Sequence, residues 1–114
     1  MKKILTISLA LILVIMSLAG CSSQSKGAEI TLITDKGNID DKSFNQGAWE
    51  GVVAFAKENN ISHQYIKPEE ASDAGYLAAI DLAVQGGAKV IVTPGYLFEV
   101  PIYEAQTKYP EVKF

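Results

Sequence analysis

The sequence contains few of the residues that most often carry chemistry: only one of its 114 residues is a cysteine and only one is a histidine. A single cysteine cannot form an intrachain disulfide, so stability must come from a hydrophobic core. A single histidine, His63, leaves no visible set of nucleophile, base and orienting group, so we expect a structural His63 and no enzyme. With 10 basic and 13 acidic residues, the chain also lacks the basic surface that nucleic-acid binding requires.

The first 20 residues have the pattern of an export signal. Two lysines precede an apolar run over 4–18, which is too short for a comfortable transmembrane helix. The run ends in Leu-Ala-Gly-Cys, which resembles the lipobox of bacterial lipoproteins, and Cys21 would then be the lipidated N-terminus. We predict a signal peptide over 1–20, a flexible tether over 21–29, and a lipid anchor on the extracytoplasmic face of the cell membrane. The alternatives are a buried free thiol and an uncleaved anchor helix.

Residues 30–114 alternate between strand-like and helix-like patterns. We expect strands near 29–34, 61–67 and 88–95 and helices near 43–60, 72–86 and 98–108. This order predicts an α/β fold, a doubly wound parallel sheet with helices on both faces. The third strand has no alternation, so we expect it to be buried on both faces. Residues 112–114 look like the start of a fourth strand, which predicts a truncated product or a fragment of a longer protein.

The first helix has a recognisable start. Ser43 fits an N-cap, and Gln46 is placed to complete a capping box with it. Asp40 and Asp41 precede the helix, where carboxylates complement its dipole. Trp49, one turn into the helix, is expected to pack inward.

Ligands of doubly wound sheets bind beyond the carboxyl ends of the strands, where the strand order reverses. For an order 2-1-3-4 that place lies between the loops at 35–45 and 93–98. Asp35 ends a buried strand there, and its carboxylate can accept hydrogen bonds from ligand hydroxyl or N–H groups. Phe44 can stack on a flat heterocycle, and the amide of Asn45 can both donate and accept. These three residues are the predicted ligand-binding site, and an uncharged purine or pyrimidine suits them.

Two other motifs in this stretch do not fit. The segment 37–43 has the glycine, lysine and serine of a phosphate loop, but Asp41 replaces the second glycine and adds negative charge where phosphates would bind. A calcium loop starting at Asp35 would need glycine where Asp40 stands and glutamate where Gln46 stands. The sequence therefore predicts neither a metal nor a cofactor.

The stretch DKGNIDDKSFNQGAWEG at 35–51, with the lipobox before it and YPEVKF at the end, resembles the basic membrane protein family. Its members are substrate-binding lipoproteins of ABC transporters and include purine nucleoside receptors. The resemblance implies a two-lobed type I periplasmic-binding fold that closes on a nucleoside and delivers it to a permease. Residues 30–114 would be an incomplete N-terminal lobe. Asp35 and Asn45 would be polar contacts to the nucleoside, and Phe44 one of two aromatic faces around the base.

The resemblance leaves two further functions open. A membrane-tethered sensor or interaction protein could use the same lobe to present the ligand-bound state to a partner. An enzyme on a similar scaffold would need a catalytic set that the sequence does not contain. The family's second lobe has no counterpart in these 114 residues, so we expect little affinity from this chain alone.

Overall fold

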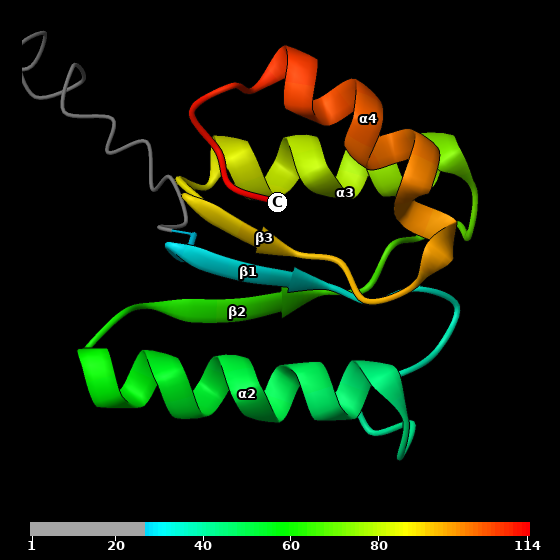
Figure 1. Ribbon diagram of the computed structural model, residues 1–114. Coiled ribbons are helices and arrows are strands. Elements are labelled where there is room, and N and C mark those ends of the chain that lie inside the picture. The colour runs from blue at the N-terminus through cyan, green and yellow to red at the C-terminus, as the bar shows by residue number, and fades with distance from the viewer. Residues whose placement is uncertain (1–26) are drawn as a thin grey trace, which may run out of the picture.

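The computed structural model describes residues 27–114 (Figure 1). The predicted signal peptide, Cys21 and most of the predicted tether lie outside these residues. In chain order, the elements are β1 (Ile30–Ile33), α2 (Phe44–Asn59), β2 (His63–Ile66), α3 (Asp73–Gln85), β3 (Val90–Val92), the 3₁₀ helix η1 (Tyr96–Phe98) and α4 (Glu99–Lys108). Within 27–114, none of the helices combines the length and apolar character needed to cross a membrane.

The sheet is parallel, with strand order β2-β1-β3. Ile30 of β1 pairs with His63 on one side and Val90 on the other. Val90 also forms a parallel bridge with Lys113, so the C-terminal segment starts to pair along the outer side of β3. Helix α2 covers one face of the sheet, and α3 and α4 cover the other (Figure 1). The prediction of a doubly wound α/β fold is confirmed.

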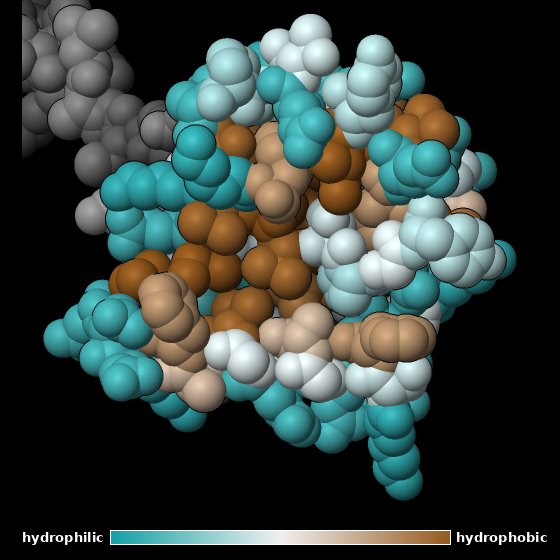
Figure 2. Space-filling model, viewed as in Figure 1, coloured by the Kyte–Doolittle hydropathy of each residue, from teal (hydrophilic) through white to brown (hydrophobic). Residues whose placement is uncertain are grey.

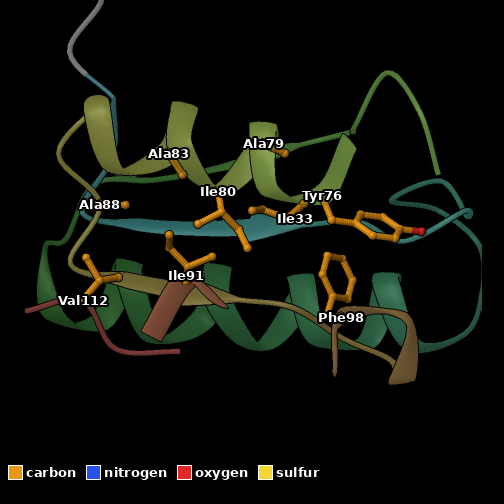
Figure 3. Packing of buried hydrophobic residues seen from close by; sticks show 10 residues of the cluster. Ile33, Tyr76, Ala79, Ile80, Ala83, Ala88, Ile91, Phe98 and Val112 are labelled. Carbon is orange, nitrogen blue, oxygen red and sulfur yellow. The ribbon is translucent and has the colours of Figure 1, made fainter. Parts of the chain in front are cut away.

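All four residues of β1 are buried, because the strand is central and has helices on both sides. Successive side chains of a strand point to opposite faces. Leu32 accordingly joins the hydrophobic cluster on the α2 side, whereas Ile33 joins the larger cluster under α3 and α4. Figure 3 shows this larger cluster, in which Ile33, Ile80 and Ile91 lie together. Full burial of such a side chain contributes about 1.5–3 kcal/mol.

Helix α3 begins where the sequence predicts. The Ser72 hydroxyl accepts a hydrogen bond from the backbone N–H of Gly75 at 3.1 Å, which is an N-cap. The buried residues of α3 are Tyr76, Ala79, Ile80 and Ala83. Two of these four are alanines, so the helix axis can lie close to the sheet.

Strand β3 is less covered than its sequence predicts. Ile91 is buried, but Val90 and Val92 are only partly buried. Both valines belong to the cluster on the α2 side, and α2 packs against β1 and β2 rather than β3. Figure 2 shows apolar surface over the front of the sheet. The expectation of a third strand buried on both faces is therefore wrong for two of its three residues.

The folded domain starts before residue 30, where the sequence predicts the end of the tether. Ala28 is buried. The carbonyl oxygen of Glu29 accepts hydrogen bonds from the backbone N–H groups of Lys89 and Val90. These contacts attach the segment before β1 to the start of β3.

Candidate ligand-binding site

The loops after β1 and β3 meet at Asp35. Gly95 has a backbone φ of +117°, a conformation that residues other than glycine rarely adopt. A Cβ atom built on Gly95 would lie 3.6 Å from Asp35 Oδ2. The carboxyl ends of parallel strands share one edge of the sheet, and this proximity of Gly95 to Asp35 places the two loops near each other there, as the strand order predicts.

The two carboxylate oxygens of Asp35 have different surroundings. Oδ1 accepts hydrogen bonds from the backbone N–H of Gly37 and from Asn45 Nδ2, both at 2.8 Å. Oδ2 faces Gly95 and accepts no hydrogen bond from any residue in 27–114. One oxygen therefore fixes the orientation of the carboxylate, and the other keeps its acceptor capacity.

Asn45 lies buried between two carboxylates. Its Nδ2 donates to Asp35 Oδ1 at 2.8 Å and to Asp41 Oδ2 at 2.9 Å. Its Oδ1 accepts from the backbone N–H of Asp35 at 3.3 Å. Only 1% of the residue is exposed. In this arrangement both amide hydrogens of Asn45 are directed at protein oxygens, and the residue links the start of α2 to the end of β1.

Asp41 forms the cap that the sequence assigns to Ser43. Its Oδ1 accepts from the backbone N–H groups of Ser43 at 2.8 Å and Gln46 at 3.1 Å, and its Oδ2 accepts from that of Asn45 at 3.3 Å. Ser43 is at the N-cap position, but its side chain makes no capping hydrogen bond. Gln46 reaches back to the N–H of Lys42 rather than to that of Ser43. The predicted capping box is therefore wrong, because a carboxylate two residues before Ser43 already occupies the free N–H groups.

These contacts affect the ionisation of Asp41. Desolvation by itself would raise the pKa of the carboxyl, but the N–H groups of Gln46, Ser43 and Asn45 stabilise the charged form and lower it. Asp41 is thus held as a carboxylate, and it does more than complement the helix dipole.

Phe44 and Trp49 lie on the same helix but in different surroundings. Phe44, the first residue of α2, is 78% exposed. Trp49 is partly buried, with its ring edge-on to Tyr65 at 5.4 Å and tilted against His63 at 5.6 Å. Trp49 packs toward the sheet, as predicted, although its ring is only partly buried. His63 lies on β2 under this indole, consistent with the structural role expected for it.

Sequence reasoning did not find the roles of three residues near the site, namely Asp41, Gly95 and Tyr76. The Asp41-Lys-Ser spacing is typical of an Asx turn and could have identified the cap. Gly95 follows a proline after β3, a typical loop signal, but its approach to Asp35 is visible only in three dimensions. Tyr76 is buried, and its hydroxyl has no hydrogen-bond partner among residues 27–114.

This arrangement is suited to binding rather than to catalysis. It offers an oriented carboxylate oxygen on Asp35 and an exposed aromatic ring on Phe44, at the start of the next helix, which favours a solute with hydroxyl or N–H donors and a flat face. Residues 27–114 contain no cluster of side chains that could hold a metal ion. A hollow of about 700 Å³ lies elsewhere, between residues 66–70 and α3, and no predicted site residue lines it.

The sequence profile of one protein family, described as ABC transporter substrate-binding protein PnrA-like, matches residues 28–114. Three relatives illustrate the similarity. The CD4+ T-cell-stimulating antigen of Listeria monocytogenes is 34% identical over 100% of this chain and 36% of its own. The ABC transporter nucleoside-binding protein BmpA of Lactococcus lactis is 28% identical over 99% of this chain and 35% of its own. An uncharacterized lipoprotein of Pyrococcus abyssi is 29% identical over 100% of this chain and 30% of its own.

Among solved structures, an ABC transporter solute-binding protein from Aeropyrum pernix K1 is similar, with a TM-score of 0.64 and 29% identity. The similarity covers 74% of this chain and 22% of that one. The chain thus spans about a third of the length of the relatives it matches. The matched family consists of substrate-binding proteins rather than enzymes.

Proposed function

This chain belongs to the family of PnrA-like ABC transporter substrate-binding proteins, and from that membership we propose that it is the nucleoside-binding part of a lipid-anchored ABC importer. The observation that carries the proposal is the carboxylate of Asp35, held through Oδ1 and open at Oδ2, in the loop that leads to the exposed Phe44 at the start of α2. The relative from Lactococcus lactis is named a nucleoside-binding protein, which supports this ligand class.

Each predicted site residue has a distinct part in the proposal. Asp35 accepts a hydrogen bond from a ligand hydroxyl or N–H group through Oδ2. The ring of Phe44 stacks on the base, and its high exposure leaves the aromatic face free to do so. Asn45 keeps the Asp35 carboxylate in position, and a direct contact between Asn45 and the ligand stays a prediction.

The proposal includes the membrane and the transporter as partners. Cys21 carries the lipid that holds the protein at the extracytoplasmic face, and an ABC permease receives the solute. The lipobox in the sequence and the lipoprotein relative from Pyrococcus abyssi support the anchor. The ligand is enclosed when a second lobe closes over the Asp35 loop.

Nucleoside uptake tests the proposal directly. Deleting the gene should reduce uptake of radiolabelled inosine, adenosine or guanosine, and calorimetric titration of the whole gene product should show binding of at least one of them. Unchanged uptake together with no binding would contradict the proposal. Binding with unchanged uptake but an altered signalling response would instead indicate the sensor function.

A further inference from the structure

Tyr96 is an exposed aromatic residue on a firmly anchored turn. It is the first residue of η1, and 83% of it is exposed. Phe98, two residues later, is fully buried, and its ring lies 4.5 Å from that of Tyr76 (Figure 3). Because Phe98 fixes the turn against α3, the backbone that carries Tyr96 is fixed as well.

This turn lies next to the open side of Asp35. Gly95, directly before Tyr96, faces Asp35 Oδ2, the oxygen that keeps its acceptor capacity. Phe44 directly precedes Asn45, whose amide is bonded to Asp35 Oδ1. Two exposed aromatic residues, Phe44 and Tyr96, are therefore each next in the chain to a residue that lies near this carboxylate.

The electrostatic surroundings of Tyr76 agree with this placement. Burial raises the pKa of its phenol, and the charges of Asp35, Asp73 and Tyr96 raise it further. Asp35 and Tyr96 are thus both among the charged or ionisable neighbours of the Tyr76 phenol. Figure 3 shows that hydroxyl at the end of the cluster away from Ala83 and Ala88.

We propose that Tyr96 is a specificity-determining residue, which packs its ring against the sugar of a bound nucleoside and hydrogen-bonds a sugar hydroxyl with its phenol. The inference rests on the proposed function and extends it to a residue outside the predicted site. Phe44 has only an apolar face, which suits the base, whereas tyrosine combines an apolar ring with a polar tip. The free oxygen of Asp35 lies on the Tyr96 side, so the hydroxyl-rich part of the ligand belongs there.

The test compares inosine with its free base, hypoxanthine, by titration calorimetry on the whole gene product without the predicted signal peptide. Tyr96→Ala should weaken inosine binding by roughly ten-fold or more, since a packed ring and a hydrogen bond are both lost. Hypoxanthine binding should change by less than about two-fold, since the base does not contact Tyr96. Tyr96→Phe should weaken inosine binding by an intermediate factor, because only the hydrogen bond is lost.

Tyr103→Ala is the matched control. Tyr103 is 76% exposed on α4, so its removal should change neither affinity nor the melting temperature. Inosine binding by Tyr96→Ala at the wild-type affinity would overturn the inference while leaving the proposed function intact. An equal loss for inosine and hypoxanthine would also overturn it, by assigning Tyr96 to the base. If the wild-type protein bound no nucleoside, that result would contradict both the proposed function and this inference.

Discussion

Asn45 donates both amide hydrogens to carboxylates, one on Asp35 and one on Asp41. The three side chains form a chain of hydrogen bonds from the end of β1 to the first turn of α2. Two negative groups can lie this close to one amide because that amide and several backbone N–H groups stabilise them. The orientation of the carboxylate proposed to bind ligand therefore depends on residues that need not touch the ligand.

Phe44→Ala should lower nucleoside affinity by roughly 1–3 kcal/mol, the range seen when a base loses an aromatic stacking partner. Folding should hardly change, because the ring is 78% exposed. Phe55→Ala is the control, since Phe55 is 53% exposed further along the same helix. Calorimetric titration with inosine, adenosine and guanosine measures both variants. Wild-type affinity of Phe44→Ala for all three would exclude the stacking role.

Asp41→Asn should destabilise the protein at neutral pH, because an amide cannot replace a carboxylate that accepts from several N–H groups. The folded state lowers the pKa of Asp41, so its contribution is present above the unfolded pKa and is lost as the pH falls through the folded one. The gap in melting temperature between wild type and variant should thus narrow on acidification. Asp40→Asn is the control, since Asp40 is exposed and accepts no hydrogen bond within 27–114. A gap that stays constant down to the lowest pH would contradict the capping role.

Helices α3 and α4 are joined at their outer surface by Asp81. Its carboxylate accepts from Lys108 Nζ at 2.9 Å and from the hydroxyl of Tyr109 at 2.8 Å. Burial alone would raise the pKa of Asp81, but the hydrogen bonds from Lys108 and Tyr109 outweigh it and lower the pKa. Beneath this contact, buried Ile80 belongs to the core that holds α3 on the sheet.

Asp81→Asn should cause only a small loss of stability, because exposed ion pairs contribute little. The pKa of Asp81 is lowered on folding, so its stabilising effect exists above the unfolded pKa and disappears at lower pH. Ile80→Ala, in contrast, should cost about 2–5 kcal/mol at every pH. Denaturant unfolding at pH 7 and pH 3 measures both. A loss for Asp81→Asn that equals the loss for Ile80→Ala would show that the polar contact governs helix packing.

The sequence predicts the order of the elements well because their signals are local. Ser72 lies directly before the first residue of α3, and Pro101 lies in the first turn of α4, so each residue is close to the helix start that it marks. The site is predicted less completely, because its contacts join residues far apart in the chain. Buried Asn45 is bonded to Asp35, which is ten residues earlier in the chain. Gly95 lies near the same aspartate, although it follows a different strand. Such contacts follow from the strand order and not from any local pattern.

In the proposed membrane-bound receptor, the folded domain starts close to the predicted lipid anchor at Cys21. Only six residues separate Cys21 from Ala28, which is already buried in the domain. The proposed ligand-binding site lies at the other end of the sheet, because β1 runs from Ala28 at one end toward Asp35 at the other. With the proposed lipid on Cys21, we expect the end of the domain that contains Asp35 to be directed away from the membrane.

Cys21→Ala should abolish lipidation and release the protein from the membrane fraction, since one thiol carries the predicted acyl anchor. Metabolic labelling with a radioactive fatty acid, followed by fractionation, measures both effects. Ser22→Ala, one residue further on, should behave as wild type. Equal labelling of wild type and Cys21→Ala would exclude the anchor.

The apolar surface over the front of the sheet has a consequence for residues 27–114 taken alone. Val90 and Val92 are only partly covered, and β3 has a single bridge on its outer side. We expect this segment to be marginally stable and prone to aggregation in isolation, because sheet edges and apolar patches promote association. Analytical ultracentrifugation with thermal unfolding tests this. A monomer with one cooperative transition would contradict the expectation.

Trp49 is the only tryptophan in the sequence, and its indole packs against Tyr65 and His63. Both partners belong to β2, whereas Trp49 belongs to α2. The fluorescence emission of Trp49 therefore depends on whether α2 is packed against β2. Phe44, five residues earlier on α2, does not absorb at the wavelengths that excite the indole of tryptophan. The chain thus contains a built-in optical reporter of whether α2 is seated on the sheet.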